Sequence, residues 1–392
     1  MIRPTRLWRA LTAVLAVSAA TFAGVIAPAS PAGAAPPPLP APNSNGITLD
    51  GWTQVTSSEG AGVPRYIDAT VRTAAIFAPG PSGSTPSINP LAKQIKVRIL
   101  VPANYDANRA TPYPVLYLLH GGAADFEQWS KTDQGRIKEL VAGSAFNGIV
   151  VMPEGGKSGW YSNWYGEADG HFSPQWETFH VGQLVPWVDA NFNTSGTKQG
   201  RALAGVSMGG LGALAYGARF NQTFSAIGSF SGGTDLGDPA GQDTVANSMW
   251  FYGATTWWNG NFDGAYRVNN WGTGSSLDQR TYRLQTVFGP AQVVNGVSTY
   301  PTHSPIEMTP NYAAYNGKLA FYAGQDGEAE NGAWNTRFHN RLKANNVAHR
   351  YCTGYGTHAW DYWIPEMRDF LAFVYGTTPT TCTTNAGWTL QP

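Results

Sequence analysis

The chain has 392 residues, of which 42% are hydrophobic, so it is long enough to bury the core of a large enzyme domain. Its 25 basic and 25 acidic residues cancel, and charged residues make up only 13% of the chain. Because no basic stripe is visible in the sequence, nucleic acid is not an expected partner.

The first residues have the pattern of a secretory signal peptide. Three arginines, Arg3, Arg6 and Arg9, precede an apolar run over residues 11–26, and small residues ending at Ala34 match a cleavage site. The alternative is a membrane anchor, but the apolar run is short for a membrane span. We therefore expect residues 1–34 to be removed, and a secreted, extracellular protein that is not integral to a membrane.

From residue 95 onward, segments that resemble strands alternate with segments that resemble helices. The predicted strands are apolar or alternating runs that end near glycine or proline. Counted together with the residues of the turn or exit loop that follows each strand, they lie at residues 95–102, 114–122, 148–156, 201–206, 224–233, 318–327 and 348–360. The predicted helices lie at residues 176–192, 208–220, 334–346 and 361–376, with Pro186 as an irregularity in the first. This alternation predicts an α/β fold with a mostly parallel central sheet and helices on both faces.

Residues 234–316 interrupt the alternation with a segment rich in tryptophan, asparagine and glycine. We interpret the segment as an insertion over the active site, since tryptophans suit both sugar faces and acyl chains. A cap that is packed only for stability is the alternative. The insertion belongs to a predicted domain over residues 49–378, which follows a proline-rich spacer at 35–48 and precedes a tail at 379–392.

The two cysteines, Cys352 and Cys382, both lie near the C-terminus. An exported protein meets oxidising conditions, under which a disulfide would tie the tail to the last predicted strand. Two unpaired thiols are the alternative. No histidine cluster with ligand spacing accompanies the cysteines, so no metal site is expected.

The segment Gly205-Val206-Ser207-Met208-Gly209 lies where a predicted strand meets a predicted helix. A Gly-x-Ser-x-Gly pattern is weak by itself, but this strand–turn–helix setting is the one that a nucleophile elbow requires. Glycines flank the serine because the sharp turn leaves no room for β-carbons on neighbouring backbone. Ser207 is therefore the candidate nucleophile, and a tight turn with an incidental serine is the alternative.

A serine hydroxyl needs a base to remove its proton. Of the seven histidines, His358 alone lies in a loop that leaves the last predicted strand, downstream of the serine, which agrees with the usual order of nucleophile, acid and histidine. The acid is expected after the strand at 318–324, where Asp326, Glu328 and Glu330 follow. Asp326 is the first choice and Glu328 the next, but the pattern does not separate the three.

The reaction also needs two fixed N–H donors for the oxyanion. Met208 follows the nucleophile at a helix N-terminus, and Gly122 lies in the glycine turn after the strand at 114–119, so their amides are the candidates. We expect His120 and Trp360, which neighbour the glycine turn and His358, to contact the substrate.

The ordered motifs YLLHGG, VVMPEGGKSGWYSNWYG, QWETF, GVSMGG, VFGP and GTHAWDYW resemble a known family. The chain is similar, from about residue 95 to 375, to the secreted trehalose mycolyltransferases and diacylglycerol acyltransferases. These form the antigen 85 group of the esterase-D-like α/β-hydrolases. The resemblance implies a single α/β-hydrolase domain without a cofactor, and acyl transfer through an acyl-serine at Ser207 with His358 as the base.

Two positions depart from the pattern of that group. Its Asp-Gly-Leu-Arg turn is replaced by His120-Gly121-Gly122-Ala123, which removes residues of the sugar-binding end. Its catalytic glutamate corresponds to Asn340, so the resemblance implies that the acid has moved to the loop at 326–330, as in ordinary esterases of the superfamily.

The expected function is therefore a secreted serine acyltransferase or esterase that acts on a small-molecule, lipid or carbohydrate ester. A plain carboxylesterase of the feruloyl or acyl type is the alternative within this chemistry. A non-catalytic binding protein on the same fold is a further alternative, because a fold does not determine function.

Overall fold

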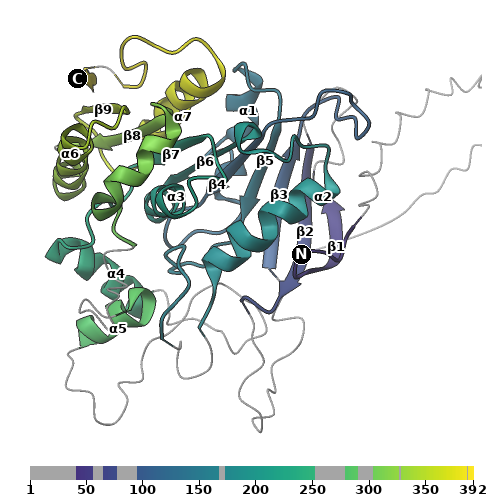
Figure 1. Ribbon diagram of the computed structural model, residues 1–392, viewed down its shortest axis with the longest axis horizontal. Coiled ribbons are helices and arrows are strands. Elements are labelled where there is room, and N and C mark those ends of the chain that lie inside the picture. The colour runs from purple at the N-terminus through teal and green to yellow at the C-terminus, as the bar shows by residue number, and fades with distance from the viewer. Residues whose placement is uncertain are drawn as a thin grey trace, which may run out of the picture.

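The structure is a computed structural model that describes residues 41–55, 65–76, 95–166, 173–251, 279–289, 303–325, 328–385 and 387–392. The expected signal peptide lies outside these residues. The described chain is organised around one central sheet, with helices on both of its faces (Figure 1).

The described residues form a 10-stranded sheet in the order β1-β2-β3-β5-β4-β6-β7-β8-β9-β10. The central strands from β5 to β9 run parallel, and antiparallel strands extend the sheet at both edges, so the expected mostly parallel sheet is confirmed. The strands are β1 (Ile47–Gln54), β2 (Arg65–Thr73), β3 (Ile95–Val101), β4 (Val115–Leu119), β5 (Ile149–Pro153), β6 (Arg201–Val206), β7 (Ala226–Phe230), β8 (Leu319–Gly324), β9 (Arg350–Gly354) and β10 (Thr389–Gln391).

Alternate side chains of the central strands face opposite sides of the sheet and build two separate cores. In β4, Leu116 and Leu118 belong to one core, whereas Tyr117 and Leu119 belong to the other. Every residue of β4 is buried, because helices cover both faces. This is why the strand reads as a continuous apolar run rather than as an alternation.

Helices α1 and α7 cover one face of the sheet, and α2, α3 and α6 cover the other. Helices α4 and α5 pack against each other away from the central strands (Figure 1). The helices are α1 (Ile137–Ala142), α2 (Val185–Asn191), α3 (Met208–Arg219), α4 (Pro239–Phe251), α5 (Gln279–Phe288), α6 (Ala329–Ala344) and α7 (Trp360–Tyr375). Every helix among the described residues falls short of the length and apolarity that a membrane span requires.

The helix expected over 176–192 is divided at Pro186. A wide π-helical segment, Thr178–Leu184, runs directly into α2, with Pro186 in the first turn of α2. Proline has no N–H to donate to the preceding turn and its ring crowds the carbonyl there, so the helix widens just before it.

Within the expected insertion at 234–316, the structure describes α4, α5 and a 3₁₀ segment, Pro305–Tyr315. Residues 252–278 and 290–302 lie outside the described residues, and they include Trp257, Trp258 and Trp271. The expectation that these tryptophans cover the active site therefore stays a prediction.

The C-terminal tail is attached to the last strands. Cys352 in β9 and Cys382 in the tail form a disulfide. Further along, β10 pairs antiparallel with β9, which places Leu390 opposite Cys352. The sequence pattern did not predict β10, β1 or β2.

Candidate active site

Ser207 occupies the turn between β6 and α3, with its backbone at φ 55° and ψ −119°. A residue other than glycine is strained at positive φ. The flanking glycines make the turn possible, because a Cβ on Gly205 would overlap the backbone of Gly209, and a Cβ on Gly209 would overlap the carbonyl of Leu119. The N–H of Ser207 donates to the carbonyl of Phe230 on β7 at 2.8 Å. The turn is thus fixed by its neighbours, and Ser207 stands at the carboxyl edge of the sheet.

His358 lies in the short loop between β9 and α7, and its ring meets Ser207. The Nε2 atom is 2.8 Å from Ser207 Oγ, which is hydrogen-bond distance for the hydroxyl to donate to the ring. In that arrangement Nδ1 carries the ring proton and faces Glu328. The side chain of Trp363 packs edge-on against the ring, with centroids 4.8 Å apart.

Glu328 is the carboxyl group that the structure places beside His358. Its Oε2 lies 3.4 Å from Nδ1, and its side chain is buried. Of the other two expected carboxylates, Asp326 lies outside the described residues and Glu330 lies in the first turn of α6. Glu328 directly precedes α6, where the positive end of the helix dipole favours a negative charge.

Two side chains that the sequence analysis did not identify hold Glu328 in place. The hydroxyl of Ser231 donates to Oε1 at 3.0 Å, and the amide of Asn331 donates to Oε2 at 2.9 Å. Trp363 Nε1 donates in turn to Ser231 Oγ at 3.0 Å, so the serine has its own proton free for Glu328. Because each oxygen of Glu328 is bound from a different element, the carboxylate has little freedom to rotate.

A second acidic residue, Glu366, is buried on α7 near this network. It has no solvent exposure, and its two carboxyl oxygens have no hydrogen-bond partner among the described residues. Burial raises the pKa of Glu366 well above its ordinary value, and the negative charges of Glu328 and Asp369 raise it further. The neutral, protonated form of Glu366 is therefore favoured.

Gly122 and Met208 lie close together and line the same cavity as Ser207. A Cβ on Gly122 would stand 4.0 Å from the Cβ of Met208. Among the described residues, neither N–H has a hydrogen-bond partner, whereas the amides of Gly121 and Ala123 donate to Gln128 and to a carbonyl. The two candidate oxyanion donors are thus the unengaged amides of this turn.

His120 and Trp360 occupy different places from the substrate contacts that we expected. His120 is buried, accepts a 2.8 Å hydrogen bond from Gly155 N–H at Nε2, and its Nδ1 is 2.8 Å from the carbonyl of Gly121. Trp360 packs edge-on against Trp129 and Trp363. Neither side chain lines the two cavities at Ser207 described below, so both support the walls of the site.

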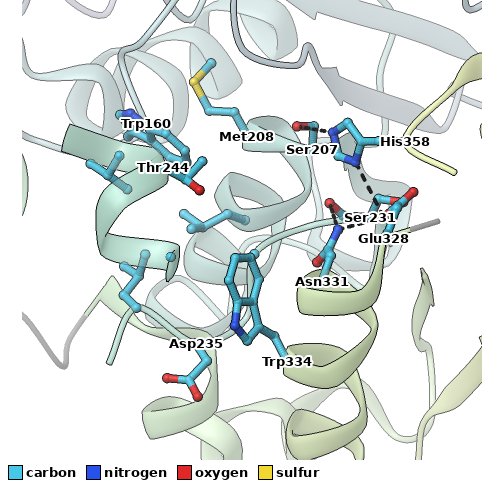
Figure 2. Close-up of a pocket in the computed structure, with 15 residues that line it drawn as sticks. Trp160, Ser207, Met208, Ser231, Asp235, Thr244, Glu328, Asn331, Trp334 and His358 are labelled. Carbon is cyan, nitrogen blue, oxygen red and sulfur yellow. Dashed lines mark hydrogen bonds and ion pairs between the residues drawn. The ribbon is translucent and has the colours of Figure 1, made fainter. Parts of the chain in front are cut away.

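A cavity of about 540 Å³ opens beside Ser207. Ser207 and His358 stand at one side of it, Trp160 and Thr244 lie across from them, and Trp334 forms the floor in the view of Figure 2. The lining residues come from the strand ends and from α3, α4 and α6: Trp160, Ser207, Met208, Leu211, Ser231, Gly233, Asp235, Leu236, Gly241, Thr244, Val245, Glu328, Asn331, Trp334 and His358.

A second cavity of about 350 Å³ reaches Ser207 from the side of the glycine turn. It shares Trp160, Met208 and Thr244 with the first cavity, and adds Gly122, Lys157 and other residues of the turn and of α4. Ser207, His358 and Trp160 thus line both cavities, which meet at Ser207. Metal binding has no support in the described residues, which contain no group of three histidine, cysteine, aspartate or glutamate side chains suited to an ion.

The model of the Esterase family, described as a putative esterase, matches residues 88–287, which is half of the chain and includes Ser207 and the glycine turn. The chain belongs to the Esterase family. Among curated proteins, an esterase of Mycobacterium tuberculosis is 46% identical over 141 residues, which cover 36% of this chain but only 29% of that protein. The match thus spans less than a third of that relative's length.

The acyltransferases of the antigen 85 group match more of the chain. Diacylglycerol acyltransferase/mycolyltransferase Ag85A of Mycobacterium leprae is 28% identical over 290 residues, covering 68% of this chain and 77% of that protein. The corresponding Ag85B of Mycolicibacterium smegmatis is 27% identical over 274 residues, covering 64% and 74%. The resemblance to the antigen 85 group that the sequence motifs predicted is confirmed.

Solved structures agree on the fold. MPT51 of Mycobacterium tuberculosis aligns with a TM-score of 0.53 at 20% identity, covering 74% of this chain and 96% of that one. A ferulic acid esterase aligns with a TM-score of 0.52 at 20% identity, covering 80% and 98%. The expected α/β-hydrolase fold is therefore confirmed.

Proposed function

We propose that this protein is a secreted serine esterase that acts through an acyl-serine intermediate, with Ser207, His358 and Glu328 as its catalytic triad. The observation that carries the proposal is the 2.8 Å approach of His358 Nε2 to Ser207 Oγ, at a strained turn beside two unengaged amides. Membership in the Esterase family supports the same chemistry.

In the first half of the reaction, Ser207 Oγ bonds to the acyl carbon of the ester while its proton passes to His358 Nε2. The carbonyl oxygen becomes an oxyanion, which the amides of Gly122 and Met208 stabilise. The bond from the acyl carbon to the leaving alcohol then breaks, and the alcohol takes the proton from His358. The acyl group is left on Ser207.

In the second half, water attacks the acyl-serine and gives its proton to His358, which returns the proton to Ser207 as the acid is released. Glu328 holds the imidazole in the tautomer with a proton on Nδ1 and stabilises the imidazolium as it forms. The ring of His358 is 45% exposed, so water can reach the base, which favours hydrolysis.

Acyl transfer to an alcohol is the second candidate, because two cavities meet at Ser207. One cavity would hold the acyl group while the other admits an acceptor in place of water. The relatives named as acyltransferases support this candidate. Both reactions use the same triad and differ in whether an alcohol displaces water at the acyl-serine.

Secretion is supported by the arginine-rich, apolar N-terminal pattern and by the disulfide between Cys352 and Cys382. The substrate is an ester small enough, at its acyl end, to enter one of the two cavities. His120 and Trp360 are assigned to positioning the turn and the wall rather than to touching the substrate.

Hydrolysis of p-nitrophenyl esters of increasing acyl length tests the proposal. We expect turnover by the wild type, its loss in Ser207→Ala, and its retention in Ser195→Ala, a control in the loop between α2 and β6. Turnover that survives in Ser207→Ala would reject the proposed triad. Adding trehalose or diacylglycerol separates the two candidates, because an acylated acceptor indicates transfer and free acid alone indicates hydrolysis.

A further inference from the structure

The C-terminal tail is anchored to the sheet at several separate points before it reaches β10. The buried guanidinium of Arg350 in β9 donates to the carbonyls of Pro379 and Thr381, at 2.9 and 2.6 Å. Its ion-pair partner Asp369, on α7, accepts from the N–H and the hydroxyl of Thr383. The disulfide to Cys352 lies between these contacts. The tail therefore has a fixed course across β9 and α7.

This course brings Trp388 against the loop at residues 355–359, which carries His358. Trp388 is buried, and its Nε1 donates to the carbonyl of Tyr355 at 2.6 Å. The ring leaves no room for a side chain on two neighbouring glycines. A Cβ added to Gly354 would lie 2.5 Å from the ring, and a Cβ added to Gly356 would lie 2.8 Å from it. The ring also stacks on Tyr362, at the start of α7.

The same loop also packs on the end of β8. A Cβ on Gly356 would stand 3.2 Å from the Cα of Gly324, and a Cβ on Gly324 would stand 2.6 Å from the carbonyl of Gly356. The loop is thus held in a narrow space, in close contact with both the end of β8 and the ring of Trp388. Replacing Trp388 with a small side chain would open one wall of that space.

We infer that the C-terminal tail is a positioning element for His358, and that it acts through Trp388. The inference rests on the proposed role of His358 as the base. The ring of His358 contacts Ser207, Glu328 and Trp363, but its side chain is 45% exposed, so these contacts cover only part of it. The position of the ring therefore depends also on the backbone of the loop that carries it. A displacement of about 1 Å at a catalytic group costs up to about 100-fold in rate.

The experiment compares Trp388→Ala with Leu390→Ala in the full secreted chain. Leu390 packs against the same core as Trp388 but pairs with Cys352, away from the His358 loop. For p-nitrophenyl ester turnover, we expect kcat of Trp388→Ala to fall by about 10- to 100-fold with KM within about twofold of wild type. Leu390→Ala should keep kcat near the wild-type value, because it leaves the loop contacts in place.

The nuclear magnetic resonance signals of the His358 ring give a readout that does not depend on turnover. They should shift or broaden in Trp388→Ala and stay unchanged in Leu390→Ala. Should Trp388→Ala not fold, Trp388→Phe keeps a ring against the glycines but loses the donor to Tyr355, and it should show a smaller change in the same direction.

Wild-type kcat and unchanged ring signals in a folded Trp388 variant would overturn the inference. An equal loss of kcat in Leu390→Ala would also overturn it, because the tail would then act through general stability. Failure of the proposed function appears separately, as turnover that persists in Ser207→Ala, and the ring signals still report whether Trp388 positions His358.

Discussion

Glu328 meets His358 because it lies at the point where the chain enters α6. Its Oε1 and Oε2 are bound by Ser231 and Asn331, which leaves the carboxylate facing Nδ1 of the ring. The neighbouring acid Asp326 is only two positions earlier, so a substitution there is a matched control for the loss of a loop charge.

We expect Glu328→Gln to lower kcat by about 10³- to 10⁴-fold, because an amide does not stabilise the imidazolium or enforce the tautomer with a proton on Nδ1. Asp326→Asn should keep kcat within a few-fold of wild type. Steady-state kinetics of the two variants measure this directly. The reverse result, with Asp326→Asn inactive and Glu328→Gln active, would assign the acid to Asp326.

Glu366 gives a prediction about stability and pH. Burial and the charges of Glu328 and Asp369 raise its pKa in the native state. In the unfolded state the pKa is about 4.3. At a pH between these two pKa values, the native state holds a proton that the unfolded state has released. This group's contribution to stability therefore falls as pH rises through that window. Glu366→Gln keeps the shape and removes the titration.

We therefore compare the unfolding free energy of Glu366→Gln with that of wild type at each pH. The difference, variant minus wild type, should be higher at pH 8 than at pH 4. Chemical denaturation of both proteins at the two pH values measures the difference, and kcat should stay near wild type. A difference between the variant and wild type that is the same at both pH values, or that is lower at pH 8 than at pH 4, would contradict the raised pKa of Glu366.

The sequence could predict residues whose roles follow from local context. Ser207 lies between a clear strand and a clear helix, and His358 directly follows the last predicted strand. Glu328 could not be separated from Asp326 and Glu330, because three acids within five positions look alike until the start of α6 is known. Ser231 was missed, since its hydrogen bond to Glu328 joins segments 97 residues apart. Asn331 lies only three positions from Glu328, but the two could not be paired before the start of α6 was known.

At the scale of elements, the turn between β6 and α3 depends on close backbone contact. A Cβ on Gly209 would overlap the carbonyl of Leu119 and stand 2.6 Å from that of His120. Neither carbonyl belongs to a flexible side chain, so the turn itself would have to move. At the exposed Gly182, an added Cβ would have no atom within 4 Å, so a substitution there is a control for the same change without a clash.

We expect Gly209→Ala to lower stability by about 1–3 kcal/mol or more, and to lower kcat because the displaced turn carries Ser207 and Met208. Gly182→Ala should leave kcat unchanged and stability equal or higher, since alanine is the better helix former. Thermal unfolding and ester turnover measure both effects. Equal behaviour of the two variants would contradict the close packing of the turn.

The central strands could be predicted because both of their faces are buried, which gives strong apolar runs such as β4 and β5. The outer strands β1, β2 and β10 could not; the reasons are clear for the two edge strands, β1 and β10. β10 has only three residues, and it pairs with β9 across a tail whose course is set by contacts such as the disulfide, which the sequence pattern does not show. β1 is partly exposed, so its pattern is diluted by polar residues.

At the scale of the whole molecule, the disulfide joins the tail to the sheet across a separation of 30 residues. Closing a loop of that size lowers the entropy of the unfolded chain by an amount worth roughly 3–4 kcal/mol. We expect the double variant Cys352→Ser/Cys382→Ser to lose about that much stability in denaturant unfolding. A reducing agent should destabilise the wild type similarly and leave the double variant unchanged, whereas no effect on the wild type would contradict a structural disulfide.

The central claim is that His358 activates Ser207 as a nucleophile, and covalent labelling with a fluorophosphonate tests it most directly. Trypsin would release residues 202–219 as a peptide in which Ser207 is the one serine, so mass spectrometry can locate the adduct. We expect an adduct on Ser207 in the wild type and its strong reduction in His358→Ala. An unlabelled wild type, or an adduct at another residue, would contradict it.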